Sequence, residues 1–443
     1  MKPHHLLSAL ALFFSGLPHA GAEAVKDREG AVRGDKAAME NDARWIYNDW
    51  KKGFEEAKRQ GKPLLIVLRC VPCISCMGID TQVLLQESDV SPLLDKFVCV
   101  RVINGNALDL SLFQFDYDLS FSALIFNGDG TVYGRYGSWT HQKNAQEKST
   151  AGLKETLQTA LNIHSGYPAN KASLAGKQGG PIPFKTPIEI PGLAGKYRHE
   201  LDWQGKVVQS CVHCHQIGDA FRTSTWEQKK PVPLEWIFPH PGPECIGLEM
   251  DLNRAVKVTG VSKDSPAAKA GLQAGDEITS LAGQPLVSVA DLSWVLHRAP
   301  ETTTLPVSVK RNGAPVSLNL ELTGGWRQKS NISRRVGTWD MRGMVLGGLL
   351  LEELPDAERE SLKLGADALA LRVKHVGQYD RHAAAKRAGF KANDVIVEID
   401  GSSARATEGQ VIGRLLTGHR IGESVKATVL RGDQRLTFSL PMQ

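Results

Sequence analysis

Two cysteines and a histidine near the middle of the chain have the spacing used for covalent attachment of a c-type haem. They are Cys211, Cys214 and His215, in the run CVHCH. On a short helical turn both sulfurs can reach the two vinyl groups of one porphyrin, and the following imidazole can bind the iron. The spacing therefore predicts haem c as a cofactor, with His215 as the metal ligand. Two other chemistries stay open, a structural disulfide and a zinc site completed by His213.

The second axial position of such a haem would be empty or would be filled by a side chain from nearby sequence. The candidates, in order of preference, are His240, His199 and Met250. Histidine nitrogen and methionine sulfur are the usual protein ligands of haem iron in electron carriers. We therefore expect His240 to lie near His215.

A second group of thiols, Cys70, Cys73 and Cys76, directly follows the apolar run 64–68, which has the length of a buried strand. A helical stretch through 83–94 is expected next. A cysteine at a helix N-terminus has a lowered pKa, because the unpaired N–H groups favour the thiolate. The cluster therefore predicts redox-active thiols. A structural disulfide, or a soft metal such as Cu(I), is the alternative.

The elements around this cluster are expected in an order that resembles the thioredoxin fold over 40–164. An amphipathic helix is predicted before the cluster, and strands, a turn and a final helix after it; the ranges are 38–60, 97–103, 123–126, 127–130, 132–136 and 152–163. The resemblance implies that Cys73 is the exposed nucleophile and Cys76 the resolving thiol, with Cys70 forming a second overlapping pair. Phe121 stands where the family usually has a cis-proline. Cys99, in an apolar strand, is expected to be a buried small hydrophobe.

Two stretches of different composition follow this domain. Residues 165–195 are rich in Gly, Pro, Lys and Ala without sustained periodicity, which predicts a flexible linker. Residues 196–244 form a compact segment that carries the haem motif. The linker would separate the first thiol cluster from Cys211 and Cys214.

The C-terminal half contains a repeat. The pattern Ala-x-x-Ala-Gly, an apolar residue, x-Ala-x-Asp-x-Ile occurs at 267–278 and again at 385–396, each time between runs of β character and before a helical stretch. This pattern resembles PDZ domains of the HtrA-protease type, which implies domains at 245–325 and 326–443. No Gly-x-Ser-x-Gly occurs in a strand–turn context, and no region is left for a protease domain, so a protease is excluded.

The PDZ resemblance implies binding of protein or peptide C-termini by strand addition, with a loop of backbone N–H groups at the carboxylate. The matching loops are Ile246-Gly247-Leu248 and Leu346-Gly347-Gly348-Leu349. The alternative is that one or both grooves are filled internally and act as spacers. Cys245, beside the first loop, could be free or paired.

The whole chain, 443 residues with 42% hydrophobic and 23% charged residues, is typical of a multidomain globular protein. A formal charge of +5 without blocks of like charge does not indicate nucleic-acid binding. Residues 1–22 have a basic start, an apolar core and small residues at the −3 and −1 positions of a cleavage site after Ala22, which predicts a signal peptide and export to the periplasm or an equivalent envelope space. No later run is long enough to cross a membrane.

These observations predict a multidomain architecture: an α/β thioredoxin-like domain, a small haem-motif segment and two mainly-β PDZ domains. The predicted function is thiol–disulfide redox chemistry in the envelope, with the haem serving an electron-transfer partner and the PDZ domains recruiting a protein. The alternative is a non-enzymatic PDZ scaffold or sensor with structural or Cu- or Zn-binding cysteines.

Overall fold

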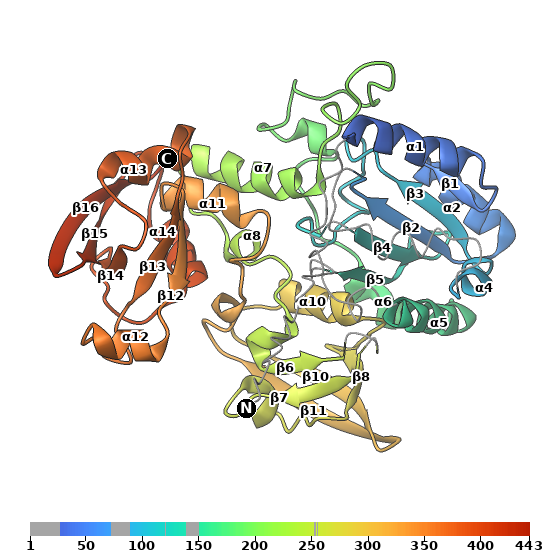
Figure 1. Ribbon diagram of the computed structural model, residues 1–443. Helices are drawn as coiled ribbons and strands as arrows, with labels where there is room; N and C mark the ends of the chain where they lie inside the picture. Colours follow the sequence, from blue (N-terminus) through green and yellow to red (C-terminus); the bar gives the residue numbers. More distant parts are fainter. Residues whose placement is uncertain (1–26, 72–88, 120, 139–149, 252–253, 255) are drawn as a thin grey trace, which may run out of the picture.

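The computed structural model describes residues 27–71, 89–119, 121–138, 150–251, 254 and 256–443. The predicted signal peptide, the first half of the predicted helix 83–94, and Cys73 and Cys76 lie outside these residues. The described chain confirms the predicted fold class, because a mixed α/β domain is followed by a helical segment and two domains built on antiparallel strands (Figure 1).

The N-terminal domain is a five-stranded sheet in the order β1-β3-β2-β4-β5. β1, β3 and β2 run parallel, while β4 and β5 pair antiparallel at the other side. The strand bounds are β1 Trp45–Tyr47, β2 Leu64–Arg69, β3 Val98–Val102, β4 Phe121–Phe126 and β5 Val132–Ser138. β2 and β4 are buried along their whole length, so the sheet has an apolar core on both faces.

The helices of this domain differ from the prediction in one place. The single helix expected over 38–60 is wrong, since α1 (Arg28–Glu40) ends before β1 and α2 (Trp50–Gln60) begins after it. The break has a local cause: the Asp49 side chain accepts from the Lys52 N–H at 2.9 Å and starts a new helix. The short α4 (Ser91–Leu94) and the terminal α5 (Ala151–Ser165) complete the domain.

The flexible linker predicted at 165–195 is a second correction. This segment forms α6 (Lys171–Leu174) and the 3-10 turns η3 (Ala175–Lys177) and η4 (Pro187–Glu189), and it packs along the thioredoxin-like domain. Its apolar residues join the two cores of the sheet, with Leu174 in the core on one face and Ile190 and Leu193 in the core on the other. A segment too polar to make its own core is thus ordered by cores that already exist.

The helical segment that follows connects the two ends of the molecule. It consists of α7 (Cys214–Glu227), α8 (Leu234–Ile237) and the 3-10 turn η5 (Pro243–Ile246). Ile217 and Phe221 of α7 pack in the core of the thioredoxin-like domain, whereas Trp226 at its other end packs in the core of the C-terminal domain. The Trp226 indole N–H also donates to the carbonyl oxygen of Gln443 at 2.8 Å.

The first PDZ domain contains a four-stranded sheet and a separate two-stranded one. Its strands are β6 Leu248–Met250, β7 Val258–Val261, β8 Glu277–Leu281, β9 Gln284–Pro285, β10 Thr303–Arg311 and β11 Ala314–Leu322, with orders β11-β10-β8-β9 and β6-β7. Its helices are α9 (Pro266–Lys269) and α10 (Val289–Arg298), and the turn η6 (Arg327–Lys329) follows β11. Figure 1 places this domain below the thioredoxin-like sheet, with α10 between them.

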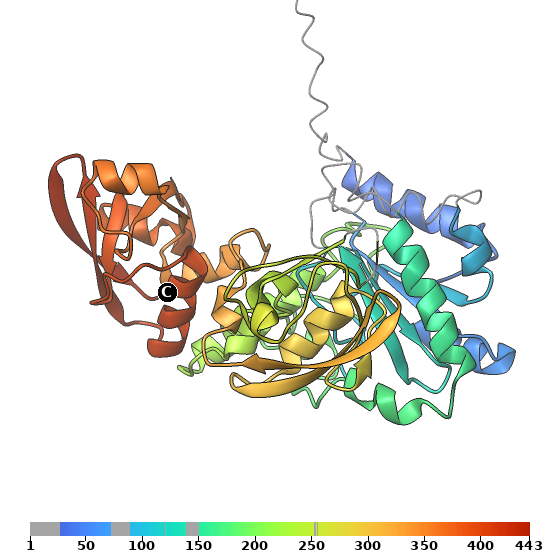
Figure 2. The same ribbon diagram turned by 90° about the horizontal axis from the view of Figure 1, so that it is seen from below.

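The second PDZ domain has one five-stranded sheet in sequential order. Its strands are β12 Leu349–Glu353, β13 Leu371–Val376, β14 Val395–Ile399, β15 Ser424–Arg431 and β16 Gln434–Pro441; its helices are α11 Thr338–Val345, α12 Asp356–Ser361, α13 Ala384–Ala388 and α14 Glu408–Gly418, with the 3-10 turn η7 Asp380–Ala383. Both views place this domain at the opposite end of the molecule from the thioredoxin-like domain (Figure 2).

The sequence repeat corresponds to a repeated ion pair. In the first PDZ domain Arg311 Nε lies 2.8 Å from buried Asp276, and in the second Arg431 Nε lies 2.7 Å from buried Asp394. Each guanidinium also donates at 2.8 Å to the carbonyl of the glycine that ends the short helix, Gly271 or Gly389. Among the described residues, no helix is both long and apolar enough to cross a membrane.

Candidate functional site

The described thiol of the first cysteine cluster lies at one edge of the thioredoxin-like sheet. Cys70 directly follows β2, and the adjacent strand β3 ends at the same edge because the two strands are parallel. Phe121, the first residue of β4, pairs with Arg69 and is buried. The residue at the usual cis-proline position therefore lies beside Arg69, next in sequence to Cys70.

The segment before α7 is fixed to this same edge by Asn106, which is fully buried. The Asn106 side-chain amide donates to the carbonyls of Arg198 and Ser210, at 2.7 and 2.8 Å. Its Oδ1 accepts from the Val212 N–H at 2.7 Å. A β-carbon on Gly105 would lie 2.6 Å from the Val212 carbonyl oxygen, so this close approach needs glycine.

This docking places the two cysteine motifs against each other. The Sγ of Cys70 and the Nδ1 of His213 lie 3.0 Å apart and share a hydrogen bond. Cys70, His213, Cys211 and Cys214 all line one cavity of about 30 Å³, whose other walls are mostly aliphatic. A cavity of that size has room for about two water molecules. Thiols far apart in the sequence therefore share a small, largely apolar space.

The two thiols of the CVHCH run are unpaired and lie in a largely apolar environment. Neither Cys211 nor Cys214 is in a disulfide. The Cys211 Sγ donates to the Ile103 carbonyl at 3.3 Å, and burial raises its pKa to about 11. Burial also raises the pKa of Cys214 to about 12, although this residue begins α7. Desolvation thus outweighs the helix N-terminus, which alone would favour the thiolate.

His215 faces a different environment from the two thiols. It does not line the cavity shared by Cys211 and Cys214, and its Nδ1 lies 3.2 Å from Asp219 Oδ2 one helical turn later. Burial opposes a charge on this imidazole, but the bond to Asp219 prevails and raises its pKa. A covalent haem needs both sulfurs and this imidazole on one porphyrin-sized space. The described arrangement does not fit that group, and haem c stays a prediction.

The other predicted haem ligands do not lie in the cavity that Cys211 and Cys214 line either. His240 is buried and stacks on His297, with ring centroids 4.3 Å apart, in a second cavity of about 230 Å³. His199 is exposed, and Met250 ends β6 in the first PDZ domain. Across the described residues, no group of three or more His, Cys, Asp or Glu side chains could hold a metal ion. The zinc alternative through His213 therefore has no support there, and the copper alternative involves Cys73 and Cys76, outside the described chain.

Three residues of this site carry no sequence motif for this role. The sequence predicts His213 only as a possible zinc ligand, although it is the residue in contact with Cys70. Asn106 and Gly105 lie in an irregular stretch after β3, and no motif marks them. The available signal was the Asn-Gly-Asn run at 104–106, whose polar groups directly follow a buried strand.

The loop of the first PDZ domain has the expected backbone. Gly247 has a φ of +83° and ends η5, and Leu248 then begins β6. The Gly247 carbonyl accepts from the Ser262 N–H at 2.8 Å. β6 pairs with β7 on one side, and within the described sheets no strand is paired to its other edge. Cys245 beside this loop is a free thiol buried in the domain core.

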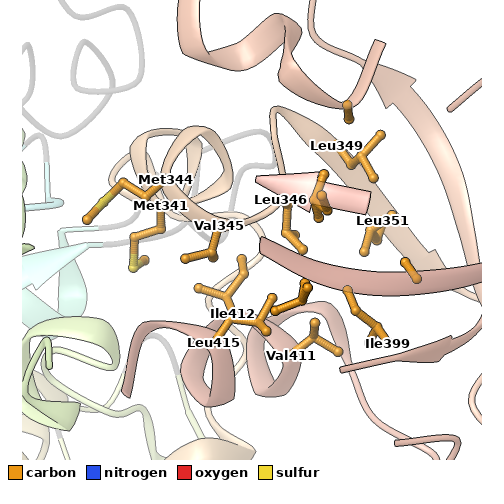
Figure 3. Close-up of a cluster of buried hydrophobic side chains, with 14 of the residues drawn as sticks. Met341, Met344, Val345, Leu346, Leu349, Leu351, Ile399, Val411, Ile412 and Leu415 are labelled. Carbon is orange, nitrogen blue, oxygen red and sulfur yellow. The ribbon is translucent and has the colours of Figure 1, made fainter. Parts of the chain in front are cut away.

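The corresponding loop of the second PDZ domain is bonded internally. The Gly348 N–H donates to the Arg342 carbonyl at 2.9 Å, and the Leu351 N–H on β12 donates to Glu408 Oε1 at 2.8 Å. The Arg342 guanidinium also pairs with the Glu408 carboxylate at 2.6 Å. Met341, Met344 and Val345 of α11 lie against Ile412 and Leu415 of α14 in the same core cluster (Figure 3). Leu346, Gly347 and Leu349 lie within this packed region.

Comparison with protein families agrees with this division of the chain. The family model described as thioredoxin-like matches residues 45–128, and the model described as PDZ domain matches 245–322 and 371–442. The chain therefore contains a thioredoxin-like domain and two PDZ domains. The second PDZ match begins after β12 and its loop.

Curated relatives match mainly over the PDZ region. Periplasmic serine endoprotease DegP of Escherichia coli K12 is 41% identical over 75 residues, 17% of this chain and 16% of that protein. A DegP-like periplasmic serine endoprotease of Pseudomonas fluorescens is 30% identical over 202 residues, 44% of this chain and 40% of that protein. The chain spans less than half the length of each relative. The solved serine endoprotease from Yersinia pestis is 36% identical over 15% of this chain and 25% of its own, with a TM-score of 0.15.

Proposed function

We propose that this protein is a thiol–disulfide redox protein of the cell envelope whose PDZ domains hold a protein partner. The observation that carries the proposal is the position of Cys70, at the carboxyl edge of a thioredoxin-like sheet and in contact with His213. An imidazole next to a thiol is a common means of activating sulfur for nucleophilic attack. Cys73 and Cys76 remain the proposed exchanging pair, as the family resemblance implies.

Partner binding is assigned chiefly to the first PDZ domain. Its strand β6 has one edge available for the addition of a peptide strand, next to the Gly247 turn. In the second domain the Gly348 and Leu351 amides already have internal partners. An envelope location is supported by the periplasmic relatives and by the predicted signal peptide.

The redox part is tested by measuring disulfide reductase activity of the mature full-length protein on a protein disulfide. Cys73→Ser is expected to lower the rate by about a hundredfold, because the attacking thiol is lost. Cys70→Ser tests the contribution of the His213 contact and is expected to lower the rate by about tenfold. Cys99→Ala is the matched control, since this thiol is buried in the same sheet and donates to the Leu94 carbonyl. Unchanged activity in Cys73→Ser and Cys70→Ser would refute the proposal.

The second candidate is a PDZ scaffold without redox activity, and the raised pKa values of Cys211 and Cys214 favour it, because they leave little of the thiolate that attacks disulfides. Peptide binding separates the two. Gly247→Val puts a β-carbon 2.2 Å from Ser265 Cβ at a positive φ, so it should distort the first loop and abolish binding of C-terminal peptides. A scaffold would lose its partner in Gly247→Val and keep all its properties in Cys73→Ser.

A further inference from the structure

The second dithiol, Cys211 and Cys214, has no role in ordinary thioredoxin-like chemistry, yet it lines the same cavity as Cys70. We propose that Cys211 and Cys214 are an internal redox pair that supplies two electrons to Cys70 across this cavity. This inference rests on the proposed function and deepens it, since it names what reduces the thioredoxin-like site after it has reacted with a protein disulfide.

Hydrogen bonds and one close backbone contact fix the segment with Cys211 and Cys214 against the thioredoxin-like domain. Asn106 makes three hydrogen bonds to the backbone of residues 198–212, and Gly105 allows the Val212 carbonyl to approach the edge of the sheet. A second set of bonds runs from α1, where the Glu29 carboxylate accepts from the N–H groups of Val207 and Val208 at 3.0 and 3.1 Å. The motif is therefore clamped on two sides against the domain that carries Cys70.

The position of the two cysteines on α7 is also that of an exchanging pair. Cys214 is the first residue of this 14-residue helix and Cys211 lies three residues before it. At this spacing two sulfurs can close a disulfide across a helix start, as in other Cys-x-x-Cys redox motifs. His213 between them contacts Cys70, so the motif is turned toward that thiol.

The transfer balances without any further reagent. Cys70 attacks a disulfide that Cys73 has formed with a substrate, or glutathione disulfide itself; this gives a disulfide Cys70–S–S–R, in which R–S is Cys73 or glutathione, and releases one thiol. Cys211 then attacks the Cys70 sulfur; the Cys70–Cys211 bond forms and R–S leaves as a thiol with the proton from Cys211. Cys214 next attacks Cys211, the Cys211–Cys214 bond forms, and Cys70 leaves as a thiol with the proton from Cys214. Two thiols are oxidised to one disulfide, and the mixed disulfide is reduced to two thiols.

The surroundings favour exchange inside the protein over exchange with bulk solvent. The Cys211 and Cys214 sulfurs face a cavity with room for about two waters. The Cys70 sulfur lines the same cavity, so it lies next to the pair without intervening bulk solvent. The pair should therefore be oxidised through Cys70 and only slowly by a reagent from outside.

The test follows the redox state of each cysteine in the full-length, fully reduced protein after addition of glutathione disulfide. Samples are quenched with acid, alkylated and mapped by mass spectrometry without reduction. The Cys211–Cys214 disulfide is expected to form in the parent protein, and about tenfold more slowly in Cys70→Ser. The control variant is Cys99→Ala, because the Cys99 thiol is buried on the opposite face of β3 from Val100. This variant should form the Cys211–Cys214 disulfide at the parental rate.

Two single variants trap the intermediate disulfide and show which of the two cysteines attacks Cys70 first. In Cys214→Ser the second step is blocked, so a Cys70–Cys211 disulfide should accumulate; in Cys211→Ser a Cys70–Cys214 disulfide would accumulate instead if Cys214 attacks first. Circular dichroism shows that each variant is folded, and Cys70→Ala repeats the slow oxidation with a smaller side chain. Either trapped species supports the proposal.

Three results would overturn it. The first is a Cys211–Cys214 pair that stays reduced while the cysteines of the thioredoxin-like domain are oxidised. The second is an equal rate of Cys211–Cys214 oxidation with and without Cys70. The third is a Soret band, lost in Cys211→Ser, in protein from a host with c-type haem maturation, because thioether bonds would consume both thiols. If the thioredoxin-like cysteines themselves do not react with disulfides, the proposed function fails as well.

Discussion

In the first PDZ domain, α10 is joined to the thioredoxin-like domain by buried charged and polar groups, whereas in the second PDZ domain α14 is joined to the helical segment mainly by apolar side chains. The two helices occupy matching places in the repeat, since Ser288 and Thr407 cap them through their side-chain oxygens. The equivalent helix therefore packs against another part of the molecule in both domains, through polar groups in the first and apolar groups in the second.

The contact of α10 with the thioredoxin-like domain is centred on Asp291. This carboxylate pairs with Lys177 of η3, and both side chains are fully buried. It also accepts from the Arg135 backbone N–H on β5 at 3.0 Å. The Arg135 guanidinium lies 3.7 Å above the Trp294 ring, a cation–π contact that closes the interface.

The contact of α14 is built around two glycines and an aromatic ring. β-carbons on Gly409 and Gly413 would lie 3.7 Å or less from the Phe238 ring, so the ring fits directly against the helix backbone. Ile332 and Val232 complete the same core. The charged pair in this region, Arg342 and Glu408, lies at the start of the helix beside β12.

This difference indicates different tasks. The first domain is bonded to the thioredoxin-like sheet through groups whose directions are fixed, which holds β6 at a defined place relative to the thiol site. In the second domain the Leu351 amide on the edge strand β12 is bonded to the domain's own Glu408, as expected for a domain that acts as a spacer. We expect the first interface to be the more sensitive to loss of one charged group.

The largest effect is expected for Asp291→Ala. Lys177 would be left buried without a counter-charge, a change that costs about 3–5 kcal/mol in the free energy of unfolding. Denaturant unfolding of the full-length protein measures it. The control is Glu155→Ala, which removes an exposed pair with Arg254 between the same two domains, at 2.5 Å. That loss should be below about 1 kcal/mol, because exposed pairs contribute little. Equal losses would contradict the role given to Asp291.

A smaller effect is expected for Glu408→Gln in the second domain. The amide oxygen can still accept from the Leu351 N–H, but the charge pair with Arg342 is lost, so the unfolding free energy should fall by about 2 kcal/mol.

Glu408→Ala removes both interactions and leaves the Leu351 amide available on the edge of β12. We expect this variant, measured by fluorescence anisotropy, to gain binding of C-terminal peptides at the second domain. If the parent already binds there through the Gly348 loop, the spacer role is wrong.

The sequence predicted the elements whose apolar pattern is local. β2 and β4 are continuous apolar runs, and the two PDZ domains repeat one motif with its Asp276 and Asp394. The docking of residues 196–215 onto Cys70 could not be predicted, because Asn106 and Gly105 act through contacts about a hundred residues away in the chain, which no periodicity records. The ordered, buried position of Lys177 in the predicted linker could not be predicted for the same reason, because its partner Asp291 lies in another domain.

The smallest effect tests a group that only the second PDZ domain has. His419 lies 2.8 Å from Asp400 and 2.9 Å from Glu423. In the first domain Ala282 stands at the position of Asp400, and Pro300 stands at the position of His419. Burial opposes a charge on this imidazole, but the two carboxylates prevail and raise its pKa.

Because the folded-state pKa of His419 is above the unfolded value of about 6.5, its contribution is fully present below that pH and is lost as the pH rises through the folded pKa. His419→Gln should therefore lower the unfolding free energy by about 0.5 kcal/mol at pH 5.5, and by almost nothing at pH 9, after allowance for solvent screening. Denaturant unfolding of parent and variant at the two pH values measures this difference. A loss that is the same at both would mean that the ring packs or donates a neutral hydrogen bond, and that the charged brace does not distinguish the two domains.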